Sequence, residues 1–140
     1  MANVWKLNSV KTASSTLGKY HLALSIAEKP LLESGYHIYD NVNTLIDLRN
    51  ELVHYKPETI IGTGRDKKAE VAYKLEKRLA NKKFALNALL PSNNFFPDRC
   101  LSHGCAKWSV LTSLDFTDEF FLRIGLSPPY EHIRSRLIVD

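Results

Sequence analysis

Residues 36–55 read YHIYDNVNTLIDLRNELVHY, and their apolar side chains recur every three or four positions. The members of this apolar stripe are Ile38, Val42, Leu45, Ile46, Leu52 and Val53. Such spacing is typical of an amphipathic helix that buries one face against a core. Pro57 disfavours helical backbone at Lys56, so we expect the helix to end within a residue or two of His54.

Three further segments show helical spacing, whereas alternating strand patterns are scarce. Ser102 is a suitable N-cap for the last of them, and Gly125 is a suitable residue to end it. These predicted helices span residues 15–28, 66–84 and 102–124. The tail, about 127–140, gives no clear pattern. We therefore predict an all-α fold, a bundle of about four main helices joined by mostly short connections.

Length and composition indicate a single domain over residues 1–140. Hydrophobic residues make up 44% and charged residues 24%, as in ordinary globular proteins. No apolar run approaches the ~18 residues that a membrane span needs, and the N-terminus lacks the apolar segment of a signal peptide. The chain has two cysteines, which fits a reduced pair better than a disulfide framework. We expect a cytoplasmic protein that does not bind a membrane.

The predicted helix over residues 102–124 is apolar on two sides. One face carries Cys105, Ala106, Val110, Phe116, Phe120 and Phe121, and the opposite, acidic side carries Trp108, Leu111 and Leu122. Such a helix is either central in its bundle or shared with a second chain. We favour a homodimer.

Positive charge is concentrated in one segment. The net charge is +4, and residues 65–83 hold eight basic and three acidic residues, so this segment accounts for the whole basic excess. A localised positive face attracts polyanions such as RNA, although a solvated helix face is an equally good interpretation of charge alone. The residues that we name as candidate RNA contacts are Arg65, Lys67, Lys68, Lys74 and Arg78.

Arg49 is anomalous because its spacing from Leu45 and Leu52 places it on the apolar stripe itself. A charged side chain there needs a partner, an anion or a cleft. Asn50 and His54 stand four residues apart, with Asp47 three residues before Asn50, so these three line a polar edge beside Arg49. These residue types suit phosphate chemistry, since arginine holds two phosphate oxygens and histidine transfers protons near neutral pH. An alternative stays open, in which Arg49 pairs with an acidic side chain and His54 caps the helix end.

The run from Leu45 to Tyr55 closely resembles the signature of the HEPN family (higher eukaryotes and prokaryotes nucleotide-binding domains). That signature is an arginine, a polar residue that is commonly asparagine, and a histidine four to six positions after the arginine. Arg49, Asn50 and His54 match it residue by residue. The specific match covers about a dozen residues, and the helical outline extends it loosely over the rest.

The resemblance implies an all-α homodimer in which the motifs of two chains face one cleft. It also implies a metal-independent endoribonuclease without cofactors, with Arg49, Asn50 and His54 as catalytic residues. His54 would help to activate the ribose 2′-hydroxyl and Arg49 would stabilise the charged phosphate, leaving a 2′,3′-cyclic phosphate. The expected setting is a toxin or defence system, with a cognate antitoxin or another protein as partner. The alternatives are a catalytically inactive helical module that binds nucleotide, RNA or protein, and an accessory protein that binds through its apolar last helix.

No metal site is expected from the sequence. Cys100, His103 and Cys105 lie close together, but no second ligand cluster follows at zinc-finger spacing. Two buried small residues near a helix start are the simpler interpretation of this pair. The segment from Gly62 to Lys68 resembles a phosphate-binding loop but lacks the Gly-Lys-Ser/Thr ending of a P-loop, so we expect a flexible loop there.

Overall fold

The computed structural model describes residues 15–54, 67–82, 84, 85, 87–89 and 100–137, and the side chains of residues 67–73 lie outside that description. The described chain contains helices and turns and no strand, which confirms the predicted all-α class for these residues. The elements are α2 (Thr16–Ile26), α3 (His37–Val53), α4 (Lys67–Ala80), α5 (His103–Ile124), the 3-10 helix η3 (Glu131–Ile133) and α6 (Arg134–Leu137).

The four predicted helices correspond to α2, α3, α4 and α5, with ends displaced by a few residues. Ser15 caps α2, because its Oγ accepts a hydrogen bond from the Gly18 N–H at 3.1 Å. Ser102 caps α5 in the same way, accepting from the Cys105 N–H at 3.0 Å. Gly125 ends α5 with a φ of 74°, a left-handed conformation that glycine adopts without steric cost. The cap predicted at Ser102 and the helix end predicted at Gly125 are confirmed.

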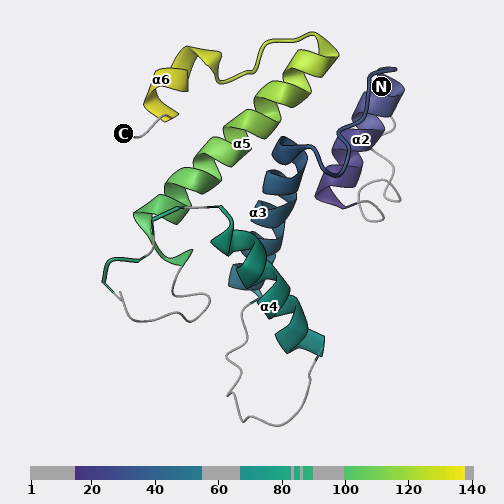
Figure 1. Cartoon of the computed structure of the whole chain (residues 1–140). Helices are drawn as coiled ribbons and strands as arrows, with labels where there is room; N and C mark the ends of the chain where they lie inside the picture. The colour runs from purple at the N-terminus through teal and green to yellow at the C-terminus, as the bar shows by residue number, and fades with distance from the viewer. Residues whose placement is uncertain (1–14, 55–66, 83, 86, 90–99, 138–140) are drawn as a thin grey trace.

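Helix α3 packs against both α4 and α5, and α2 packs against α5 (Figure 1). Val42 of α3 shares a buried cluster with Phe116 of α5, whereas Leu48 shares another with Cys105. Residue numbers therefore rise along α3 as they fall along α5, so these two helices run antiparallel. Within the described ranges, no helix combines the length and apolarity needed to cross a membrane.

Two buried clusters form the core. In the first, Tyr20 places its ring edge-to-face against Phe116 and Phe120, with ring centroids 4.8 and 4.9 Å apart. Its buried members are Leu17, Leu24, Leu32, Val42 and Phe116. The second cluster lies where α3, α4 and α5 meet, and its buried members are Leu48, Leu75, Leu79, Cys100 and Cys105. The second cluster therefore supports the end of α3 that carries Arg49.

The C-terminal tail, for which we predicted no element, folds back along α5 and contains η3 and α6 (Figure 1). Tyr130 Oη donates to Asp118 Oδ1 at 2.6 Å, and Arg134 Nη1 and Nη2 donate to the two carboxylate oxygens of Asp118 at 2.7 and 2.8 Å. A four-residue helix such as α6 has little stability of its own, so these contacts hold it in place.

The tail covers part of the acidic side of α5, the side whose apolar residues led us to expect a second chain. Tyr130 Oη also lies 3.4 Å from the carbonyl oxygen of Leu114. Trp108, which its spacing placed on that side, packs instead against the second cluster. Leu111 and Leu122 remain 37% and 73% exposed. The two-sided apolar pattern of α5 is thus accounted for in part within one chain.

Asp118→Asn is expected to release the tail. The hydrogen bond from Arg134 lowers the pKa of Asp118, so the carboxylate contributes stability above its unfolded-state pKa, near 4, and loses that contribution as the pH falls through the lower folded-state pKa. Burial, with the hydrogen bond to Asp118, raises the pKa of Tyr130 to about 12, so the phenol stays protonated at neutral pH. At pH 7, backbone amides of residues 131–137 should exchange with deuterium about tenfold faster in the variant.

Global stability should fall by less than about 1 kcal/mol, because the ion pair is about a third exposed. Glu119→Gln is the matched control, since it removes the 2.7 Å pair with Arg123 on the same helix and should leave the tail protected. Equal tail exchange in Asp118→Asn and the unsubstituted protein would contradict this role of Asp118.

Gly104 allows the first turn of α5 to approach the backbone of Ala85. A Cβ at residue 104 would lie 2.6 Å from the Ala85 nitrogen and 2.7 Å from its carbonyl oxygen. Gly104→Ala is therefore expected to destabilise the fold by about 1–3 kcal/mol in urea unfolding, despite the better helix propensity of alanine. Gly125→Ala, where the added methyl meets no atom within 4 Å, should cost only the strain of its positive φ, about 1 kcal/mol. A Gly104→Ala protein as stable as the parent would show that this approach is not tight.

Candidate functional site

The predicted catalytic residues lie at the C-terminal end of α3. Arg49 and Asn50 are near the end of the helix, and His54 is the residue that follows its last turn. The backbone N–H of His54 donates to the Asn50 carbonyl oxygen at 2.9 Å, and Arg49 Nη1 donates to Asn50 Oδ1 at 3.0 Å. All three side chains are exposed. The structure therefore brings Arg49 and Asn50 into contact and places His54 one helical turn beyond Asn50.

Arg49 is exposed even though its spacing places it on the apolar stripe, because that end of the stripe is itself exposed. Leu48 is 2% exposed and points into the second cluster, whereas Arg49 points into solvent. The packing partners of α3 cover Leu48. They do not cover the later stripe residues Leu52 and Val53, which are 38% and 58% exposed. Arg49 is consequently solvated and does not require a buried counter-charge.

Asp47 is engaged with α4 rather than with the motif. Arg78 Nη1 donates to Asp47 Oδ2 at 2.6 Å, and Arg78 Nη2 donates to Thr44 Oγ1 at 2.8 Å. Just past the end of α4, Lys82 Nζ donates to Asn41 Oδ1 at 2.6 Å. These three acceptors repeat every three residues on α3, and the two donors opposite them are four residues apart in the chain. The sequence contains both sets of polar residues at regular spacing. It does not show that the two helices are neighbours, so the pairing could not be predicted from it.

The candidate RNA-contact residues divide into three groups. Arg65 lies outside the described residues, and Lys67 and Lys68 are in the first turn of α4, where side chains are not described. Lys74 is exposed. Arg78 is partly exposed, but two of its nitrogens already donate to α3. Arg78 therefore holds α4 against α3 with the groups that a phosphate would need.

The arrangement at the end of α3 is suited to binding an anion. A guanidinium group carries five N–H donors, of which the contact with Asn50 uses one. That contact orients Arg49 without neutralising its charge, because Asn50 is an amide. Among the described residues, none forms a hydrogen bond with the imidazole of His54, and the side chain is exposed.

The two cysteines are buried in the second cluster and no disulfide joins them. The hydrogen bond with the Cys100 thiol is the main cause that lowers the pKa of Cys105, and burial acts in the opposite direction. His103 is exposed at the start of α5. In the part of the chain that the structure describes, no three side chains of His, Cys, Asp or Glu gather as metal ligands would.

Comparisons with known proteins give no relative on which to base a function. No protein-family model matches the chain, and no match was found among curated proteins or among solved structures.

Proposed function

We propose that this protein is a metal-independent endoribonuclease of HEPN type that uses Arg49, Asn50 and His54. The observation that carries the proposal is the hydrogen bond between Arg49 and Asn50, with His54 exposed one turn away on the same helix end. Together with the sequence resemblance, it supports an oriented cation and a proton-transfer group on the same helix end. The setting that follows is a toxin or defence component with a protein partner.

Arg49 would bind the non-bridging oxygens of the scissile phosphate and stabilise the extra negative charge of the pentacoordinate transition state. His54 would accept the proton of the ribose 2′-hydroxyl as its oxygen attacks phosphorus. The bond to the 5′-oxygen then breaks, and that oxygen takes a proton from a second acid. The products are a 2′,3′-cyclic phosphate and a 5′-hydroxyl, so the reaction consumes no water.

Helix α4 would bring RNA toward this site. Lys82 contacts Asn41 and Arg78 contacts Asp47, so the N-terminal half of α4 approaches the end of α3 that carries the motif. The exposed Lys74 lies at the middle of α4, in the most basic segment of the sequence. Positive charge there would attract the RNA backbone through counterion release.

The exposed position of the motif favours a site that two chains complete. A single protomer offers Arg49 and one histidine on a convex helix end, whereas acid–base catalysis needs a proton acceptor and a proton donor. Leu52 and Val53 beside Arg49 are partly exposed and would lose water in an interface. We therefore place the dimer contact at the end of α3, where the partner's motif would supply the acid.

The test is incubation of the purified protein with a mixed RNA substrate in EDTA, followed by chemical identification of the new ends. The proposal requires cyclic-phosphate and 5′-hydroxyl ends. The cleavage rate per mole of protein should fall on dilution as the dimer dissociates. Uncut RNA, or ends of another kind, would contradict it. Light scattering at the same concentrations tests the dimer separately.

A catalytically inactive module that binds nucleotide or RNA is the second candidate. This candidate is favoured because Arg78 already donates hydrogen bonds to Asp47 and Thr44, so its guanidinium has fewer donors left for a substrate. RNA that binds with strong salt dependence and is recovered uncut would select this candidate.

A further inference from the structure

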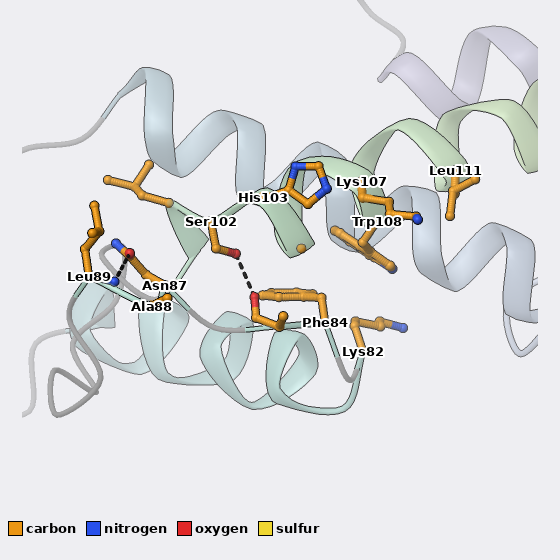
Figure 2. Close-up of a pocket in the computed structure, with 13 residues that line it drawn as sticks. Lys82, Phe84, Asn87, Ala88, Leu89, Ser102, His103, Lys107, Trp108 and Leu111 are labelled. Carbon is orange, nitrogen blue, oxygen red and sulfur yellow. Dashed lines mark hydrogen bonds between the residues drawn. The ribbon is translucent and has the colours of Figure 1, made fainter. Parts of the chain in front are cut away.

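A hollow of about 850 Å³ lies at the start of α5, bordered also by Lys82, Phe84, Ala85 and residues 87–89 (Figure 2). Its lining is mostly apolar. Phe84 and Trp108 contribute rings whose centroids are 5.8 Å apart, and both pack against the second cluster. Leu89, Leu101 and Leu111 border it and are 88%, 59% and 37% exposed. Singly exposed leucines are ordinary, but here three of them line one hollow, which we call the groove.

Two hydrogen bonds between a side chain and the backbone order the residues that line the groove. Ser102 Oγ donates to the Ala85 carbonyl oxygen at 2.8 Å, and the Leu89 N–H donates to Asn87 Oδ1 at 3.0 Å (Figure 2). Gly104 packs so closely on Ala85 that a Cβ would collide with it. These contacts fix one wall against the first turn of α5, so the groove exists without a bound partner.

The lining carries two lysines and a histidine, and no acidic residue. The three are Lys82, Lys107 and His103 (Figure 2). Lys82 donates to a neutral amide, Asn41, so its charge is not neutralised there. In the described structure Lys107 forms no ion pair. The first turn of α5 also has no acidic residue, and the positive end of a 22-residue helix faces the same region.

We propose that this groove docks an amphipathic segment of an acidic partner protein. Apolar side chains of the segment would enter beside Trp108, Leu101 and Leu111, and its carboxylates would face Lys82 and Lys107. Binding of a helix through apolar anchors with complementary charge at the rim is a common mode of recognition. A mostly apolar lining fits RNA less well, because nucleic-acid interfaces are more polar. No residue of the Arg49 motif lines the groove, so this inference does not depend on the proposed nuclease activity.

Trp108 gives a direct optical readout of binding. The chain has two tryptophans, and Trp5→Phe leaves Trp108 as the sole one. The probe is a synthetic helical peptide of about 16 residues with leucine on one face and glutamate on the other, and its matched control has glutamine in place of glutamate. The glutamate peptide should shift Trp108 emission to the blue in a saturable way, and the glutamine peptide should bind about tenfold more weakly.

Substitutions locate the binding to the groove. Lys107→Glu and the milder Lys107→Ala should each weaken binding of the glutamate peptide, by about tenfold for the charge reversal. Lys29→Glu makes the same charge change at an exposed lysine outside the groove and should leave binding unchanged. Leu111→Ser should weaken binding, whereas Leu122→Ser, a more exposed leucine of the same helix, should not. Circular dichroism establishes that each variant is folded.

Three results would overturn the proposal. One is no change in Trp108 emission up to about 1 mM peptide, a concentration above the range of weak specific docking. Another is equal binding of the two peptides, or equal weakening by Lys29→Glu and Lys107→Glu. The third is displacement of the peptide by a single-stranded RNA whose own binding depends on Lys107, which would assign the groove to nucleic acid.

Discussion

His54→Ala is expected to reduce RNA cleavage by about 10²–10⁴-fold while leaving the fold and RNA binding intact. His54 is exposed after the last turn of α3, and its described interactions are those of its backbone. Removing the imidazole therefore takes away a proton-transfer group without opening a cavity. The measurement is the initial cleavage rate in EDTA at saturating RNA, beside the affinity for RNA measured at low temperature.

Arg49→Ala should lower the rate of RNA cleavage by about 10²–10³-fold, because it removes the cation that stabilises charge in the transition state. Asn50→Ala should cost less, since Asn50 acts on Arg49 through one hydrogen bond rather than on the phosphate. A lysine at position 49 keeps the charge but loses the planar pair of donors, so Arg49→Lys should recover only a small part of the activity.

His132→Ala is the matched control, because His132 is also exposed and lies on η3, away from α3. It should cleave RNA at the parental rate. If His54→Ala cleaves as fast as His132→Ala, His54 is not the proton-transfer group, whatever the activity of the parent. Retained cleavage in Arg49→Ala would contradict the role of the guanidinium in the same way.

The parts of the fold that the sequence predicted are those set by local chemistry. The starts of α2 and α5 follow from hydroxyl groups at Ser15 and Ser102 that accept backbone N–H bonds three residues on. The end of α5 follows from Gly125, which takes a left-handed conformation. Each of these interactions joins residues within one helical turn, so no knowledge of neighbouring helices is needed.

The parts that the sequence missed depend on contacts between distant residues. Arg78 reads as one more basic residue in a charged segment, but Asp47 and Thr44, more than 30 positions away, receive its hydrogen bonds. The exposure of Arg49 could not be predicted, because spacing shows which residues share a face, not how far the packing partners of that face extend. The tail helix α6 was missed because Asp118, rather than its own sequence, stabilises it.

Leu48→Ala is expected to destabilise the fold by about 3 kcal/mol, a large part of the stability of a domain of this size. Leu48 is 2% exposed at the junction of α3, α4 and α5, where Leu75, Leu79 and Cys105 are also buried. Truncation leaves a cavity bordered by all three helices. The midpoint of urea unfolding measures the loss, and a leucine on the surface, as in Leu122→Ala, should change it by less than about 0.5 kcal/mol.

Leu24→Ala is the sharper control, because Leu24 is 0% exposed but belongs to the first cluster. Both variants should lose similar global stability, yet hydrogen exchange should separate them. Leu48→Ala should deprotect the amides of α4, which packs on the second cluster, whereas Leu24→Ala should deprotect those of α2. Uniform deprotection in both would mean that the two clusters unfold as one unit. Since Arg49 follows Leu48 on α3, only the Leu48 variant should also lose RNA cleavage under conditions where both proteins remain folded.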